Sequence, residues 1–193
     1  MGMAAPLRIY LAGPEVFLPD AVAMGREKVR LAAEAGFEGV FPLDASLDLA
    51  GLPKLEQARR ISLANEGLMH RCDVLIANLT PFRGASMDAG TAFEVGFMRA
   101  RGRPVLGYSN CSTAYADRAR AVRAGGPFPG DADAPGVEVE DFGLRENLMI
   151  EIAIRESGFE VVTRDVAAGE GMRDLAGYVQ CLALLRAHLD RLR

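Results

Sequence analysis

Apolar residues along the chain fall into short, nearly continuous runs separated by longer stretches of mixed character. Apolar runs of about four to eight residues bounded by Gly, Pro or polar residues are typical of β-strands. The segments with this pattern are 7–12, 37–41, 73–79, 104–108 and 159–163. The run 73–79 (DVLIANL) shows no alternation of polar and apolar residues, which predicts a strand buried on both faces in the middle of a sheet.

Between these runs, apolar and charged residues recur at the spacing of an α-helix. The predicted helices are 20–34, 55–70, 89–101, 147–157 and 173–192. Strands that alternate with helices predict a parallel sheet with right-handed crossovers. We therefore expect one α/β domain over residues 1–193, a three-layer fold of the flavodoxin-like or Rossmann-like kind, with about five parallel strands and helices on both faces. Ligands bind such folds beyond the carboxyl ends of the strands, here near 10–17, 73–88 and just after Tyr108.

Residues 109–146 interrupt the alternation with a passage rich in Gly, Pro and Asp (AGGPFPGDADAPG). Connections of this length without secondary structure are uncommon in compact domains and are usually functional or mobile. We expect this segment to be a lid or an interface, and we assign no role to residues 127–136.

Composition narrows the class of protein. Hydrophobic residues make up 50% of the 193 residues and charged residues 25%, which indicates a chain that folds. Lys plus Arg number 22 against 26 Asp plus Glu, a net charge of −4, so binding to nucleic acid is not expected. No apolar run approaches the roughly 20 residues that span a bilayer. The three cysteines, Cys72, Cys111 and Cys181, fit neither paired disulfides nor a zinc site and indicate a reducing cytoplasm.

The most informative residues for chemistry follow the central strand. Asp88 precedes a predicted helix and suits an N-cap, because its carboxylate can accept hydrogen bonds from free amides of the first turn. Glu94 stands among apolar residues of the same helix, and a buried carboxylate is costly unless it is paired or functional. Asp73 could have a purely structural role, in which it accepts hydrogen bonds from loop amides. Tyr10 points either into the core or toward the crevice.

Other chemistries fit poorly. The chain has no GxxxxGK[ST], no GxGxxG after its first strand and no CxxC. His70 and His188 fall in or at the ends of predicted helices away from the crevice, and neither belongs to a metal-binding cluster. The remaining repertoire is carboxylates and a tyrosine, without an evident metal or cofactor. Such a set suits glycosyl transfer, in which one carboxylate attacks the anomeric carbon.

Four groups of residues together resemble the nucleoside 2-deoxyribosyltransferases. They are residues 10–17 (YLAGPEVF), Asp73 ahead of VLIANLTPFRG, residues 88–94 (DAGTAFE), and residues 147–149 (NLM). The resemblance extends from about residue 7 to about residue 155.

The resemblance implies a reaction and roles for single residues. Glu94 would attack the anomeric carbon of a 2′-deoxynucleoside to form a covalent deoxyribosyl ester, from which a second base takes the sugar with overall retention. Tyr10 would orient Glu94. Asp73 would sit at the nucleobase and assist proton exchange. Asp88 would hold sugar hydroxyls.

The resemblance also implies partners. Gly13 and Phe17 would line the base pocket, while Asn147 and Met149 would reach the active site of a neighbouring subunit in a homo-oligomer. The substrates would be 2′-deoxynucleosides and free purine or pyrimidine bases, handled in nucleotide salvage without metal or cofactor.

Two other functions stay open. Related 2′-deoxynucleoside 5′-monophosphate N-glycosidases share the fold and hydrolyse instead of transferring. Ser86, Arg83 and the amides near Gly84 could supply the phosphate site that such an enzyme needs, although Arg83 and Ser86 also suit an ordinary surface loop. A nucleotide-binding module without turnover is the third possibility.

Overall fold

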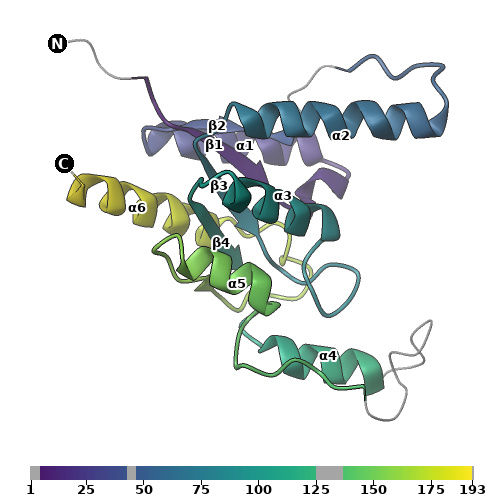
Figure 1. The fold of residues 1–193 in the computed structure, drawn as a ribbon, viewed down its shortest axis with the longest axis vertical. Coiled ribbons are helices and arrows are strands. Elements are labelled where there is room, and N and C mark those ends of the chain that lie inside the picture. The colour runs from purple at the N-terminus through teal and green to yellow at the C-terminus, as the bar shows by residue number, and fades with distance from the viewer. Residues whose placement is uncertain (1–4, 43–46, 125–136, 193) are drawn as a thin grey trace.

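Five strands form a parallel sheet in the order β2-β1-β3-β4-β5 within the residues described by the computed structural model, which are 5–42, 47–124 and 137–192 (Figure 1). The strands are β1 (Arg8–Ala12), β2 (Glu38–Val40), β3 (Val74–Asn78), β4 (Val105–Ser109) and β5 (Val162–Thr163). The chain moves to one side of β1 to form β2 and then to the other side to form β3. This reversal creates the crevice at which ligands bind in open α/β sheets.

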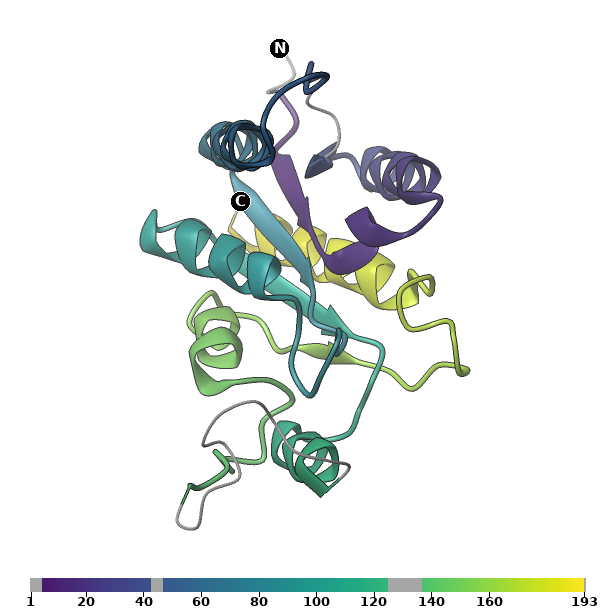
Figure 2. The ribbon, with the colours of Figure 1, turned by 90° about the vertical axis from the view of Figure 1, so that its right-hand side faces the viewer.

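The helices cover both faces of the sheet. In the described ranges they are α1 (Ala21–Glu34), α2 (Lys54–His70), α3 (Ala89–Ala100), α4 (Tyr115–Ala124), α5 (Leu148–Arg155) and α6 (Ala176–Arg191), with a short 3₁₀ helix η1 (Pro14–Phe17) after β1. Figure 2 shows α1 and α6 on one face and α2, α3 and α5 on the other. The predicted three-layer α/β fold is therefore confirmed.

The core lies along the central strands. Every residue of β3 is buried, and Leu75 and Ile76 are fully inaccessible to solvent. This burial explains the continuous apolar run, because a strand covered by helices on both faces has no side that favours polar residues. Each fully buried aliphatic side chain of this kind contributes about 1.5–3 kcal/mol to stability.

Local signals set the helix ends close to the predicted positions. The Asp88 side chain accepts a hydrogen bond from the Thr91 amide (2.9 Å) and caps α3, as predicted. Gly36 and Gly102 follow α1 and α3 with φ of 80° and 69°, a left-handed conformation that glycine adopts without a steric penalty.

Two expectations need correction. Residues 109–146 do not form one irregular segment, because Tyr115–Ala124 are the helix α4. Its sequence, YADRARAVRA, has few apolar positions, so its helical periodicity is faint. The strand expected over 159–163 is only the two residues of β5. Residues 127–136 lie outside the described part of the chain. Within the described ranges, no helix is long and apolar enough to cross a membrane.

Candidate active site

A carboxylate and a phenol meet between the sheet and α3. The Tyr10 hydroxyl donates a hydrogen bond to Glu94 Oε1 at 2.7 Å. Tyr10 is completely buried in β1, whereas Glu94 lies one and a half turns into α3 and is partly buried. The tyrosine thus lies in the core, where its hydroxyl reaches Glu94, and the strand and the helix hold the two groups.

The surroundings of Glu94 disfavour its charged form. Burial is the main cause that raises the pKa of Glu94 from 4.5 to about 7, and the negative charge of Asp88 adds to the effect. The hydrogen bond from Tyr10 and the positive charge of Lys28 act in the opposite direction. A carboxyl group with this pKa is partly ionised near neutral pH and can serve as a nucleophile.

Asp88 combines a structural role with a free carboxylate oxygen. Its Oδ2 accepts hydrogen bonds from the Thr91 amide (2.9 Å) and the Thr91 hydroxyl (3.1 Å). No group in the described part of the chain donates to Oδ1. The cap therefore leaves one oxygen of Asp88 available to a ligand in the cavity that it lines.

Glu94 borders two adjoining cavities. The first has a volume of about 300 Å³ and is also lined by Gly13, Phe17 and Asp88. The second, of about 410 Å³, extends along α2 past Glu66 and Phe93. Gly90, Ile61 and Asn65 line both cavities. Of the predicted site residues, the structure thus brings Glu94, Asp88, Gly13 and Phe17 to one cavity, with Tyr10 bonded to Glu94.

Phe17, which lines the first cavity, belongs to an aromatic stack. Phe17 is 54% exposed and stacks on Phe82, with ring centroids 5.3 Å apart and planes 11° apart. The Arg83 guanidinium carbon lies 4.8 Å from the Phe17 centroid and 4.5 Å from the Phe82 centroid. Exposed aromatic rings beside a cavity are suited to stacking on a planar ligand.

Asp73 lies at the opposite end of the sheet. It precedes β3, where its carboxylate accepts a hydrogen bond from the Arg8 backbone amide (3.0 Å) and pairs with Arg103 at 3.7 Å. It lines neither of the cavities at Glu94. The expected role at the nucleobase therefore finds no support in its placement, because ligands bind at the carboxyl ends of the strands and Asp73 is at the amino end.

Asn147 and Met149 also lie away from Glu94 within the chain. The Asn147 side chain caps α5 by accepting a hydrogen bond from the Met149 amide (3.0 Å) and donates one to Glu140 (2.9 Å). Met149 is 72% exposed. Neither residue lines the two cavities at Glu94.

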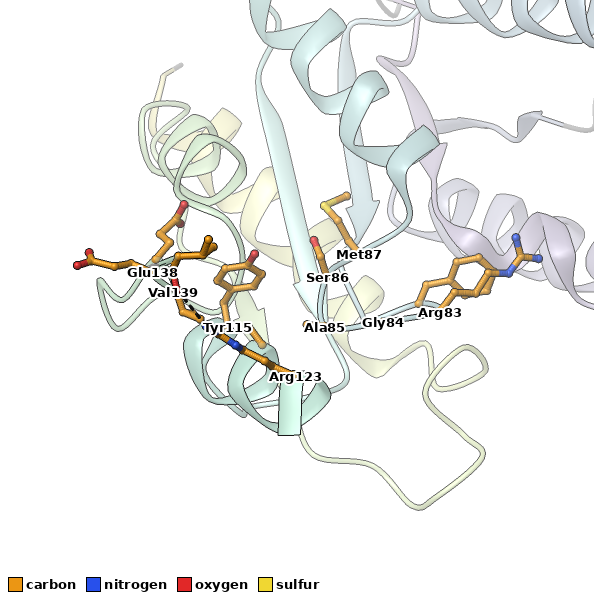
Figure 3. A pocket seen from close by; sticks show the side chains of 13 residues that line it. Arg83, Gly84, Ala85, Ser86, Met87, Tyr115, Arg123, Glu138 and Val139 are labelled. Atoms are coloured by element: carbon orange, nitrogen blue, oxygen red, sulfur yellow. Dashed lines mark hydrogen bonds between the residues drawn. The ribbon is translucent and has the colours of Figure 1, made fainter. Parts of the chain in front are cut away.

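Ser86 belongs to a different cavity, of about 550 Å³, between residues 82–87, α4 and residues 137–140 (Figure 3). Its hydroxyl donates a hydrogen bond to Glu146 at 2.6 Å. In Figure 3 the Arg83 side chain points away from Tyr115 and Arg123 across this cavity. Ser86 and Arg83 therefore do not point toward a common position at which a phosphate could bind. The Ser86 hydroxyl already donates its hydrogen bond to the Glu146 carboxylate.

Sequence reasoning missed several residues around Glu94. Asn65 and Ile61 come from α2, whose apolar residues do not form one clean stripe. The sequence carries no signal for Ile61, because its exposure (43%) is known only from the structure. His70 and His188 lie on α2 and α6 and line neither cavity, as predicted. Among the residues described, no group of three His, Cys, Asp or Glu side chains is placed to hold a metal ion.

Comparison with known proteins places the chain in a family. Residues 9–149 match the family model described as nucleoside 2-deoxyribosyltransferase. The chain belongs to this family. The predicted resemblance to the nucleoside 2-deoxyribosyltransferases is thereby confirmed, and the match spans the residues that carry Tyr10, Asp88 and Glu94.

Individual relatives agree with membership of the nucleoside 2-deoxyribosyltransferase family. A solved 2-desoxiribosyltransferase from Leishmania mexicana superposes with a TM-score of 0.61 and 29% identity, covering 91% of this chain and 98% of that one. An uncharacterized protein of Schizosaccharomyces pombe is 36% identical over 166 residues, 78% of each chain. A conserved protein from Enterococcus faecalis V583 shares the fold, with a TM-score of 0.53 and 20% identity over 92% of this chain and 99% of that one.

Proposed function

We propose that this chain transfers the 2-deoxyribosyl group from a 2′-deoxynucleoside to a free nucleobase, with Glu94 as the nucleophile. The observation that carries the proposal is the partly buried Glu94 carboxylate, held by Tyr10 at 2.7 Å and facing a cavity beside Asp88 and Phe17. Family membership and the Leishmania mexicana 2-desoxiribosyltransferase support the same reaction class.

The proposed reaction has two displacements at the anomeric carbon. In the first, a Glu94 oxygen bonds to C1′ while the N-glycosidic bond breaks; the electron pair leaves with the base, which takes up a proton. In the second, a nitrogen of the incoming base bonds to C1′, loses a proton and releases Glu94 as the carboxylate. Two inversions give overall retention. A 2-deoxy sugar lacks the electron-withdrawing 2′-hydroxyl, so positive charge at C1′ is less costly and a nearby carboxylate stabilises it.

Three other side chains have distinct parts in this proposal. Tyr10 orients Glu94 through its hydrogen bond and favours the carboxylate form. Asp88 has a free Oδ1 that can accept a hydrogen bond from a sugar hydroxyl. Phe17 offers an exposed ring on which a base can stack. Asp73 has no part in it.

The placement of Asn147 and Met149 supports a site completed by a neighbouring subunit. Met149 is exposed, and both residues lie outside the cavities at Glu94 of their own chain, so they have no role in those cavities. We therefore propose a homo-oligomer in which Glu94 of one subunit works with Asn147 and Met149 of the next.

The monophosphate N-glycosidase alternative has weaker support at Ser86. A phosphate placed at the Ser86 hydroxyl would meet the carboxylate of Glu146, which accepts from that hydroxyl at 2.6 Å. Glu146 is in turn paired with Arg118 at 3.1 Å, so both the Ser86 hydroxyl and this cation already have a carboxylate partner and are not available to a phosphate. Transfer is therefore favoured over hydrolysis of a 5′-monophosphate.

A chromatographic assay tests the proposal. The chain is incubated with 2′-deoxyinosine, with or without free adenine or cytosine, and with a 2′-deoxynucleoside 5′-monophosphate or a ribonucleoside in parallel. A new deoxynucleoside that forms only when acceptor base is present is the expected result. Equal release of free base with and without acceptor would instead show a hydrolase, and no turnover with retained binding would show a binding module.

The nucleophile is tested by Glu94→Gln, which keeps the size of the side chain and removes its charge. We expect the rate to fall roughly 10⁴-fold or more, with nucleoside affinity largely retained. Mass spectrometry of wild-type protein quenched with donor alone should detect one added deoxyribosyl group on Glu94. Unchanged turnover in Glu94→Gln would contradict the assignment.

A further inference from the structure

A second buried carboxylate lies directly beneath the candidate site. Glu15 follows Gly13 and Pro14 in η1 and is fully inaccessible to solvent. Its Oε1 accepts hydrogen bonds from Lys28 Nζ (2.8 Å), Asn78 Nδ2 (3.1 Å) and the Tyr108 hydroxyl (2.9 Å). One carboxylate oxygen therefore joins α1, β3 and β4 to the segment after β1.

Lys28 is equally buried and is enclosed by aromatic rings. Its Nζ lies 5.9 Å from the centroid of the Tyr108 ring and 5.3 Å from that of Tyr178. A buried ion pair is seldom retained for stability, because desolvating both charges costs about as much as their attraction returns. The cluster therefore calls for a role other than stability.

The other oxygen of Glu15 adds to the free-energy cost of burying this carboxylate. Oε2 is buried and has no hydrogen-bond partner in the part of the chain that the structure describes. It lies against Gly13: a Cβ added to Gly13 would be 1.9 Å from Oε2. The carboxylate thus fills the space of the missing Gly13 side chain, and Gly13 lines the cavity that contains Glu94.

We propose that Glu15, held by Lys28, is a positioning residue that fixes the Gly13–Phe17 wall of the cavity at Glu94. This inference rests on the proposed function, because the wall matters only if the cavity takes a substrate. Gly13 precedes η1 and is held from behind by Oε2, and Phe17 is the last residue of η1, two residues after Glu15. A shift of the Glu15 carboxylate would move both lining residues together.

The charges of the pair also act on Glu94. Lys28 lowers the pKa of Glu94 and Glu15 raises it, the effect of Lys28 being the larger. The other groups that face Glu94 are Tyr10 from β1, Asp88 at the start of α3 and Glu66 from α2. The pair is therefore placed to influence both the shape and the charge of the site without touching a ligand.

The test separates stability from positioning with single and double variants. Lys28→Met leaves Glu15 buried without a counter-ion and should destabilise the protein strongly. Glu15→Gln/Lys28→Met keeps the volume of the pair and the acceptor for Asn78 and Tyr108, so thermal stability should return close to that of the wild type. The matched control, Arg8→Met/Glu38→Gln, removes an ion pair (2.9 Å) at the opposite end of β1.

Two measurements on the double variant test whether the pair positions the cavity wall. In the double variant the side chain at position 15 loses the hydrogen bond from Lys28 that holds it against Gly13. We therefore expect kcat/KM to fall roughly tenfold to a hundredfold despite restored stability, because small displacements of lining groups cost rate. Hydrogen exchange of the Leu18 amide, which donates to the Glu15 carbonyl at 3.1 Å, should become faster in the free protein. The control should change neither. This second readout needs no turnover, so it decides the positioning role even if the proposed reaction is not found.

Each other outcome overturns the inference. A stable double variant with wild-type kcat/KM would mean that the pair has only a structural role. Reduced kcat/KM with unchanged exchange at Leu18 would mean that the pair acts by charge alone and does not position the wall. If the double variant does not fold, Glu15→Asp is measured in the same way, since it keeps the ionic charge and withdraws the carboxylate from Gly13.

Discussion

At the scale of single residues, the proposed reaction depends on the ionisation of one carboxylate, that of Glu94. Glu94 is buried enough to raise its pKa to about 7, yet the Tyr10 hydroxyl and the Lys28 charge keep the ionised form accessible near neutral pH. A carboxylate poorly stabilised by its surroundings gains more when positive charge develops at the anomeric carbon. In the proposed reaction, the desolvation that destabilises this carboxylate in the free protein is thus the source of its reactivity.

The pKa of Glu94 predicts the pH dependence of transfer. The proposed nucleophile is the carboxylate, so log kcat/KM should rise with pH at a slope of about one below pH 7 and flatten above it. The measurement is the initial rate of base exchange from pH 5 to 9 at low donor concentration. An acid limb near the ordinary pKa of a glutamate, 4.5, would contradict this account of the site.

Tyr10→Phe should move that acid limb to higher pH. The hydrogen bond from Tyr10 lowers the pKa of Glu94, whereas burial and the charge of Asp88 raise it. Loss of the hydrogen bond should therefore raise the pKa of Glu94 further. A hydrogen bond to a charged group is worth about 1.5–3 kcal/mol, which corresponds to a displacement of about one to two pH units. Tyr115→Phe, in α4 and outside both cavities at Glu94, is the matched control, and a limb that stays in place in Tyr10→Phe would remove Tyr10 from the mechanism.

Glu94 also predicts a pH dependence of stability. Its folded-state pKa lies above the ordinary value, so the unfolded chain loses this proton first as pH rises, and the contribution of Glu94 to stability declines between about pH 4.5 and 7. Glu94→Gln removes this decline. Thermal melting should show the variant to be more stable than the wild type at pH 8, with the difference disappearing at pH 4; a constant difference would contradict the prediction.

At the scale of elements, a buried ion pair attaches α4 to the loop that precedes α3. Arg118 of α4 donates to the backbone carbonyl of Ala85 (2.7 Å) and pairs with Glu146 at 3.1 Å. Glu146 in turn accepts from the Met87 amide at 3.1 Å and from Ser86. The loop between β3 and α3 is therefore fixed from outside by two residues that sequence patterns do not bring together.

Arg118→Met should therefore destabilise the whole chain. The change leaves Glu146 buried without its cation, which typically costs about 3–5 kcal/mol and should lower the melting temperature by roughly 10 °C. Arg120→Met removes an exposed partner of Asp141 from the same helix and should leave the melting temperature nearly unchanged. Equal changes of the melting temperature in the two variants would show that the buried pair contributes no more to stability than the exposed one.

The features that could be predicted from the sequence are those that depend on residues close together along the chain. The strands and most helices were predictable because burial imposes a local periodicity, and Asp88 was predictable because a cap is a contact with residue 91. The helix α4 lacks an apolar stripe and was missed. Asp73 was placed in the site from its neighbours in a motif, but a residue at the amino end of β3 cannot reach the opposite edge of the sheet. Contacts between distant segments, such as Glu15 with Asn78 and Tyr108, leave no local trace.

At the scale of the whole molecule, exposed apolar side chains lie on several helices, including the two that the proposed assembly uses. Phe93 of α3 is 59% exposed, and Met149 of α5 is 72% exposed. A site shared between subunits would bury Met149 and close the open side of the cavities at Glu94.

A shared site predicts complementation between two inactive variants. Glu94→Ala removes the proposed nucleophile and Asn147→Ala removes the neighbouring contribution, so each homogeneous assembly should be inactive. If each site takes Glu94 from one chain and Asn147 from another, random exchange of equal amounts restores about one site in four. Activity in the mixture should therefore approach about a quarter of the wild-type value once subunit exchange is verified by mass spectrometry of isotope-labelled chains.

Two controls make the complementation decisive. Asn147 also caps α5, so Asn147→Asp, which keeps an acceptor for the Met149 amide, separates loss of the cap from loss of the shared contact. A mixture of Glu94→Ala with Glu94→Gln should stay inactive, because every hybrid site then lacks the nucleophile. If the mixture of Glu94→Ala and Asn147→Ala stays inactive after subunit exchange is verified, each site is built from one chain. The exposure of Met149 would then have to serve a contact unrelated to catalysis.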